Sequence, residues 1–158
     1  MSLENDIQLL RQIEILDDFN ADQLRLVAFG SQRLNYPENY ELFRQDQITD
    51  GGYIIISGAI ELLEYVNGED QTRGVYGPGS ILGELALISR NKRSVTAMVR
   101  QPCEVLKITR STMHRIMDEY PELAVALQAR VSANIVELSN SLIGVHEKLE
   151  RVRFKRET

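Results

Sequence analysis

The sequence predicts an α+β fold, mainly β, in which helices at both ends flank a β sandwich or roll. Apolar residues recur at helical spacing before residue 30 and after residue 109, whereas short apolar runs separated by turn residues fill the stretch between. The 158 residues, 43% of them hydrophobic, suffice for one well-filled core. We therefore expect a single domain over residues 1–158, with N-terminal helices at 1–30, a β roll at 31–109 and C-terminal helices at 110–158.

Two short helices are predicted at the N-terminus. Their apolar residues follow helical spacing on either side of an acidic break at Asp17–Asp18. The first set is Ile7, Leu10, Ile13 and Leu16, and the second is Leu24, Leu26, Val27 and Phe29.

The middle of the chain is predicted to consist of strands. Turn residues punctuate it at Pro37–Asn39, Asp50–Gly52, Ser57–Gly58, Asn67–Gly68, Gly77–Gly79 and Gln101–Pro102. Residues 52–57 have the composition of a buried strand, and Asn67–Gly68 joins residues 59–66 and 71–76 as a hairpin. Turn signals spaced about 8–12 residues apart predict about seven or eight strands.

The C-terminal part predicts one helix over residues 111–119, stopped by Pro121, and a longer one from about residue 122. We expect the long helix to pack on the chain's own β roll up to Leu127. Its later apolar residues alternate at intervals of four and three, which favours a parallel coiled coil over residues 135–152. They are Val131, Ile135, Leu138, Leu142, Val145, Leu149 and Val152. The prediction is a homodimer through residues 131–152, and the alternative is that the whole stripe packs within one chain.

Charge and composition exclude several classes of function. The net charge of −5 gives no general attraction to nucleic acid or an anionic membrane, so we expect no nucleic-acid contact by this chain alone. Cys103 is the only cysteine, and His114 and His146 are the only histidines, so we expect neither a disulfide nor a metal centre. No apolar run approaches the roughly 18–20 residues of a membrane span, which predicts a cytoplasmic protein.

The stretch GELALISRNKRSVTA, residues 83–97, carries the strongest chemical signal. Gly83 precedes a short helical turn whose first N–H groups favour an anion, and its missing side chain lets a ligand approach the backbone. The guanidinium of Arg93 can hold two oxygens of one phosphate, and Ser94 can add a hydroxyl. Glu84 would repel a phosphate and therefore favours a neutral donor such as a ribose hydroxyl. The alternative is an ordinary ion pair between Glu84 and Arg93.

The run Gly83-Glu84-Leu85-Ala86-Leu87, five residues and then Arg93-Ser94-Val95-Thr96-Ala97 resembles the phosphate-binding cassette of cyclic nucleotide-binding domains. Such domains are found in catabolite-activator-type bacterial regulators, protein kinase A regulatory subunits and cyclic-nucleotide-gated channels. The resemblance extends over nearly the whole chain, through Leu42–Gln45, Tyr53–Gly58, Gly77–Gly79 and the helix after Tyr120-Pro121-Glu122. It implies an eight-stranded antiparallel β roll, of the jelly-roll or double-stranded β-helix type, with a long C-terminal dimerisation helix.

The resemblance also implies a role for each matching residue. Glu84 would bind the ribose 2′-hydroxyl and Arg93 the cyclic phosphate, with the backbone N–H groups of Leu85 and Ala86 completing the anion site. The position that meets the base falls at Ser139, with Asn134, Asn140 and Ser141 as weaker candidates. The expected ligand-binding set is Gly83, Glu84, Leu85, Ala86, Arg93, Ser94, Val95 and Ser139, and no catalytic or metal-binding residue is expected.

The sequence departs from the family pattern in three places. Asp46-Gln47 stands where many members have Gly-Asp, which predicts a different turn there. Leu82 replaces a frequent Phe, a tolerable apolar exchange. Ser94 stands where kinase-type domains have Ala, associated with cAMP, or Thr, associated with cGMP, so it leaves the base open. The chain has no tryptophan to stack on the base.

We therefore expect a dimeric, non-enzymatic sensor that binds cAMP, or alternatively cGMP, and couples binding to movement of its terminal helix. The sequence does not specify the downstream partner. A winged helix-turn-helix would need about 60–70 more residues after the long helix, so no DNA-binding domain is expected in this chain. The alternatives are a nucleotide-free dimerisation or protein-interaction module, the sensor fragment of a transcription regulator or ion channel, and, least favoured, a β-roll metalloenzyme.

Overall fold

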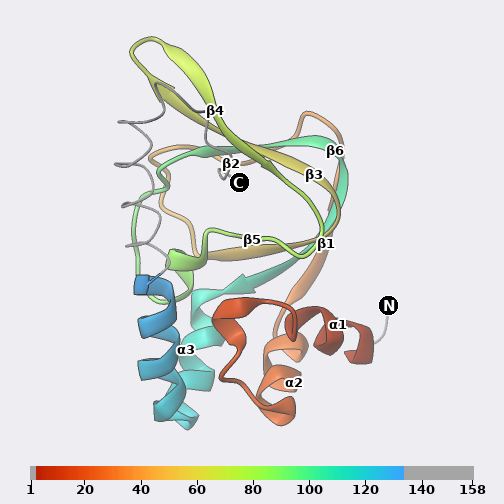
Figure 1. Ribbon diagram of the computed structural model, residues 1–158, viewed down its shortest axis with the longest axis vertical. Helices are drawn as coiled ribbons and strands as arrows, with labels where there is room; N and C mark the ends of the chain where they lie inside the picture. Colours follow the sequence, from red (N-terminus) through yellow and green to blue (C-terminus); the bar gives the residue numbers. More distant parts are fainter. Residues whose placement is uncertain (1–2, 134–158) are drawn as a thin grey trace.

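The computed structural model describes residues 3–133, in which a β roll stands on a layer of helices (Figure 1). The elements are α1 (Leu3–Leu10), the 3₁₀ helix η1 (Glu14–Leu16), α2 (Ala21–Phe29), β1 (Gln32–Tyr36), β2 (Glu41–Phe43), β3 (Gly51–Val66), β4 (Glu69–Tyr76), β5 (Ile81–Leu82), the 3₁₀ helix η2 (Glu84–Leu87), β6 (Thr96–Thr109) and α3 (Arg110–Glu119). A further helix covers residues 121–133. The predicted α+β arrangement, with helices before and after the strands, is confirmed.

The described residues form one antiparallel sheet of six strands, in the order β1-β6-β3-β4, with β2 paired to β6 and β5 paired to β3. The expected count of eight is corrected to six for this part of the chain, because two predicted turns lie inside long strands. Ser57–Gly58 lies within β3 and Gln101–Pro102 within β6. The pairing register shifts there and Gly58 takes φ 94°, so both strands bulge instead of ending.

The predicted hairpin at Asn67–Gly68 is confirmed. It joins β3 to β4, whose residues pair from Val66↔Glu69 to Ile60↔Tyr76. Both turn residues have positive φ, 55° for Asn67 and 86° for Gly68, as the tight two-residue turn of a twisted hairpin requires. The hairpin projects from the roll, far from the helices (Figure 1).

The core has two parts because successive residues of a strand point to opposite faces of the sheet. On β3, Ile54 packs among the helices, whereas Tyr53 and Ile55 pack inside the roll. On β6, Leu106 and Val105 repeat this alternation. One face of the sheet therefore holds the helices in place, and the other lines the interior of the roll.

The helix over residues 121–133 packs on the core of its own chain. Leu123, Leu127 and Val131 follow one another at intervals of four and are 2%, 0% and 0% exposed. The predicted dimer seam began at Val131, and for this residue the prediction is wrong because its side chain is buried within the chain. The remainder of the seam, residues 135–152, lies outside the described residues.

An ion-pair cluster joins this helix to the acidic break of the N-terminal region. The Nε of Arg130 donates to Asp18 over 2.6 Å, and its Nη1 lies 3.8 Å from Asp17. The hydrogen bond from Arg130 lowers the pKa of the Asp18 carboxyl against the opposing effect of desolvation. The predicted break between the two N-terminal helices is thus where the last described helix is attached.

Within residues 3–133, no helix is long and apolar enough to cross a membrane. The same residues contain no group of three or more His, Cys, Asp or Glu side chains that could hold a metal ion. His114 lies exposed on α3, and His146 lies outside the described range.

Replacing Leu127 tests whether the helix over residues 121–133 depends on the chain's own core. We expect Leu127→Ala to lower the free energy of unfolding by about 2–5 kcal/mol, because it opens a cavity at a fully buried site. Val125→Ala on the same helix is the control, since Val125 is 72% exposed and the change should stay within about 0.5 kcal/mol. Urea denaturation measures both, and equal losses would contradict this packing.

Candidate functional site

The centre of the site is the turn between β5 and the loop that leads to β6. Gly83 caps η2 with φ 76°, a conformation that favours glycine. Ala86 donates its N–H to the Gly83 carbonyl over 3.1 Å, so its amide is engaged within the turn. Of the two amides predicted to meet an anion, Leu85 is the one that precedes this first intrahelical bond.

Arg93 is a buried cation, 5% exposed, and its guanidinium is in direct contact with uncharged groups. Its Nη2 donates to the Gly51 carbonyl and its Nη1 to the Gly83 carbonyl, the latter over 3.5 Å. The ring of Phe43 lies 4.2 Å from the guanidinium carbon. The Nε is buried without a hydrogen-bond partner among the described residues. A buried charge of this kind is costly unless an anion pairs with it, so the arrangement suits a phosphate.

The groups around Arg93 affect its pKa in opposite directions. Burial lowers the pKa of the Arg93 guanidinium, Tyr53 and Asp50 oppose the change, and Arg110 adds to it. The Asp50 carboxylate is itself 3.0 Å from the ammonium of Lys107, whose hydrogen bond lowers the pKa of Asp50. The Asp50 carboxylate is therefore already paired with Lys107.

The ion-pair alternative for Glu84 and Arg93 is wrong within this structure. None of the ion pairs between residues 3–133 joins these two side chains. Glu84 is the first residue of η2 and is half-buried.

The backbone of Arg93 is fixed by the loop before β3. Its N–H donates to the Gln47 carbonyl over 2.9 Å, and its carbonyl accepts from the Asp46 N–H over 2.8 Å. Asp46 has φ 72°, the left-handed conformation that glycine adopts most easily and that Asp also tolerates. The Asp46-Gln47 departure therefore preserves a backbone course that a glycine would allow.

The other predicted residues lie near Arg93 or outside the described range. Ser94 is exposed beside Arg93 in the chain, and Val95 packs against the cluster inside the roll. Ser139 and its alternatives Asn134, Asn140 and Ser141 lie outside the described residues.

Three groups of the site were missed in the sequence. One is the backbone carbonyl of Gly51, which the sequence cannot indicate because every residue type has a backbone carbonyl. Phe43 was noticed as part of the Leu42–Gln45 run, but only the fold places its ring under the guanidinium. Arg110 is 17 positions beyond Arg93 in the sequence and reaches η2 only because β6 returns the chain to this end of the roll. No local pattern signals such a contact.

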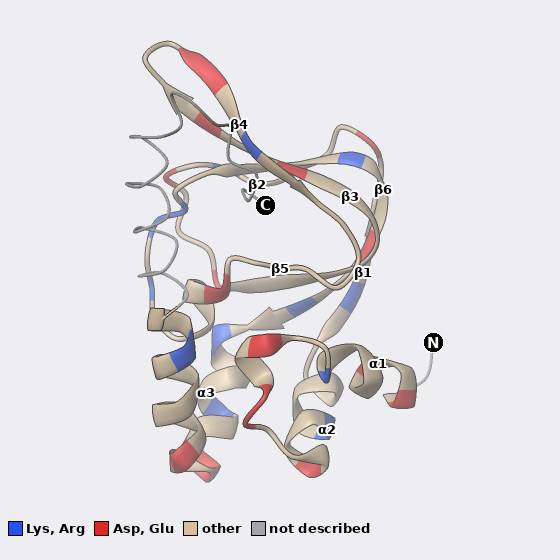
Figure 2. Cartoon of the chain, viewed as in Figure 1, with Lys and Arg blue, Asp and Glu red and all other residues tan. Residues whose placement is uncertain are grey.

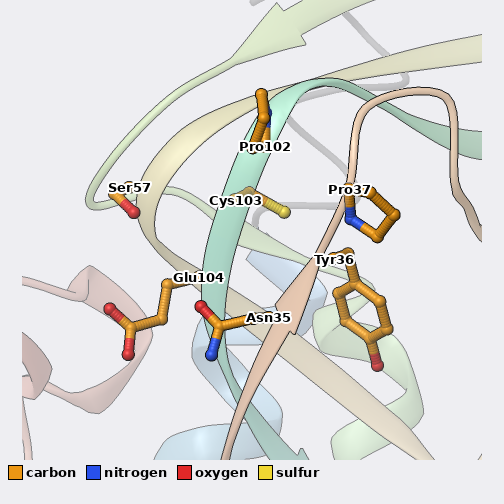
Figure 3. A pocket seen from close by; sticks show the side chains of 7 residues that line it. All are labelled: Asn35, Tyr36, Pro37, Ser57, Pro102, Cys103 and Glu104. Atoms are coloured by element: carbon orange, nitrogen blue, oxygen red, sulfur yellow. The ribbon is translucent and has the colours of Figure 1, made fainter.

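A shallow hollow of about 410 Å³ lies elsewhere, on strands β1, β3 and β6 (Figure 3). Its lining residues are Asn35, Tyr36, Pro37, Ser57, Pro102, Cys103 and Glu104. Burial raises the pKa of the Cys103 thiol, which keeps it protonated and unreactive. The hollow shares no residue with the 83–97 segment, and we do not assign the site to it.

The sequence matches the cyclic nucleotide-binding domain over residues 33–120, more than half of the chain, including η2 and Arg93. The chain belongs to the cyclic nucleotide-binding domain family. It is 27% identical over 136 residues to the cyclic AMP receptor protein of Thermus thermophilus, covering 84% of this chain. The match spans 63% of that receptor and smaller shares of other curated relatives, such as 22% of a cAMP-dependent protein kinase regulatory subunit from Eremothecium gossypii.

Solved structures of the family have the same fold. A cyclic nucleotide-binding-like protein from Brucella abortus is 39% identical, with a TM-score of 0.67, and the match covers 72% of this chain and 98% of that one. The regulatory domain of Toxoplasma gondii protein kinase A, solved with cAMP, is 23% identical, with a TM-score of 0.73. That match covers 85% of this chain and 50% of the other. This chain is accordingly a cyclic nucleotide-binding sensor domain.

Replacing Gly83 tests its close approach to Arg93. An added Cβ would overlap the Arg93 guanidinium, whereas at Gly68, which also has positive φ, it would meet nothing within 4 Å. We expect Gly68→Ala to lower the free energy of unfolding by about 1 kcal/mol through its backbone conformation alone. Gly83→Ala should lower it by at least about 1 kcal/mol more, because the guanidinium must leave its acceptors. Equal losses in urea denaturation would show that Arg93 moves aside freely.

Proposed function

We propose that this chain binds a cyclic nucleotide through residues 83–97, with cAMP as the favoured ligand and cGMP as the alternative. The observation that carries the proposal is the buried Arg93 guanidinium, whose Nε lacks a hydrogen-bond partner among the described residues. Charges of both signs are dispersed over the roll (Figure 2), so local donors rather than an overall field must hold an anion.

Each residue of the segment has a distinct role in this proposal. Arg93 pairs with the cyclic phosphate, assisted by the Leu85 N–H and the Ser94 hydroxyl. Glu84 accepts a hydrogen bond from the ribose 2′-hydroxyl. Gly83 leaves room beside the guanidinium, since a side chain there would occupy its position. Ala86 contributes through the bond that closes the turn, and Val95 through its packing in the roll.

The choice of cAMP is supported by two relatives. The Thermus thermophilus protein is named a cyclic AMP receptor, and the Toxoplasma gondii domain was solved with cAMP. Ser94 does not discriminate between the bases in the way that Ala or Thr does in kinase-type domains. We propose that Ser139 meets the base from the C-terminal helix.

The output of the sensor is proposed to be a change in the C-terminal helix of a homodimer held by residues 135–152. A ligand shifts such an equilibrium only by its differential affinity for the two placements of the helix. The attachment of the helix over residues 121–133 to the core, through Leu127 and through Arg130 with Asp18, supports a defined starting placement. In this proposal the 158 residues act as one regulatory, non-enzymatic domain.

Truncating Arg93 is the direct test of binding. We expect Arg93→Ala to weaken cAMP binding at least about 100-fold, because it removes one partner of a buried charged pair. The cAMP affinity of Arg93→Lys should lie between those of wild type and Arg93→Ala, since an ammonium keeps the charge but lacks the planar fork of donors. Isothermal titration calorimetry with nucleotide-free protein measures the affinities for cAMP and cGMP.

Arg90→Ala is the matched control, because Arg90 is an exposed arginine of the same loop. The cAMP affinity of Arg90→Ala should stay within a factor of about three of the wild-type value, as expected when a screened surface charge is removed. If the folded, nucleotide-free protein binds neither nucleotide, the proposal fails and a nucleotide-free interaction module becomes the better account. Equal losses in the Arg90 and Arg93 variants would also count against it.

A further inference from the structure

Arg110, the first residue of α3, contacts two separate segments of the cyclic nucleotide site. Its Nη1 lies within hydrogen-bonding distance of the carbonyl oxygens of Ala86 and Ser89, 3.1 and 3.3 Å away, at η2 and the turn after it. The same nitrogen is 3.2 Å from the Thr49 carbonyl, and the backbone N–H of Arg110 donates to the Asp50 carbonyl over 2.6 Å. One residue thus joins η2 to the loop that precedes β3.

The chemistry of these contacts suits an arginine. The last carbonyl groups of a helical turn lack intrahelical donors, and a cation near them is favourable. Hydrogen bonds from a charged donor are stronger than those between neutral groups. The Thr109 side chain caps α3 by accepting from the Thr112 N–H, which fixes the helix start that carries Arg110.

Both segments that Arg110 holds also provide the acceptors for Arg93. Gly51, whose carbonyl accepts from Arg93, directly follows Asp50, whose carbonyl accepts from Arg110. Gly83, the other acceptor, is the cap residue of η2. Arg110 is thus hydrogen-bonded close to both acceptors of Arg93, next to Gly51 on one side and within η2 on the other.

We propose that Arg110 is a positioning residue of the nucleotide site, which sets the spacing of η2 and the Thr49–Gly51 loop and so places Arg93 for the phosphate. This inference rests on the proposed function. It assigns Arg110 a role through the backbone of two segments and not through contact with the ligand.

The test uses Arg110→Met, which keeps the aliphatic part of the side chain and removes the donors. Without ligand, hydrogen exchange of residues 84–89 should become faster in this variant. With ligand, its affinity for cAMP should fall by about tenfold, within the range seen for residues that modulate a site indirectly. Arg110→Lys keeps a charged donor and should recover part of both effects, which also provides a test if Arg110→Met does not fold.

Arg115→Met is the control, because Arg115 is an exposed arginine on the same helix. It should leave both the exchange and the affinity unchanged. Unchanged exchange at residues 84–89 in Arg110→Met, or unchanged cAMP affinity beside a wild type that binds, overturns the role of Arg110 alone. A wild-type protein that binds neither cAMP nor cGMP overturns the proposed function, and with it the positioning role.

Discussion

Arg93 carries its charge into a place where two backbone carbonyl groups and the ring of Phe43 surround it, and where the described residues provide no paired carboxylate. Such burial opposes folding, and it persists because the chain closes around the guanidinium from several directions. β3 begins at Gly51, one acceptor, and η2 is capped by Gly83, the other. Arg93 thus links the start of β3 to the start of η2.

The rest of the fold supports this arrangement. Strands β3 and β6 run through bulges near Gly58 and Pro102, which lets two long strands span the whole roll and reach the helices. At the helical end, β6 leads directly into α3 and brings Arg110 beneath η2. The core of the helices then continues through Leu127 in the last described helix. The 83–97 segment and the helices that follow β6 are consequently joined by packing and hydrogen bonds.

Sequence reasoning predicted the parts of this structure that depend on side-chain pattern. Helical spacing located the described helices on both sides of the strands, the Asn67–Gly68 turn located the hairpin, and the spacing of Glu84 and Arg93 indicated the segment of the proposed site. It overcounted the strands because a glycine or proline signals a bulge as readily as a turn, as at Gly58 and Pro102. It assigned Val131 to a dimer seam because an apolar residue at heptad spacing serves a chain's own core equally well. It could not find the Gly51 carbonyl, since backbone acceptors are independent of residue type.

Arg93 serves to bind an anionic ligand in this account, and it does not stabilise the ligand-free fold. The most direct measurement is the free energy of unfolding of wild type and Arg93→Met, each with and without saturating cAMP. The account predicts that, without ligand, Arg93→Met is at least as stable as wild type, because an apolar side chain replaces an unpaired buried charge. With cAMP, wild type should gain about 2.7 kcal/mol at a ligand concentration 100 times the Kd, and the variant should gain far less. A ligand-free variant that is several kcal/mol less stable, with no gain by wild type from cAMP, would contradict the account and make Arg93 a structural residue.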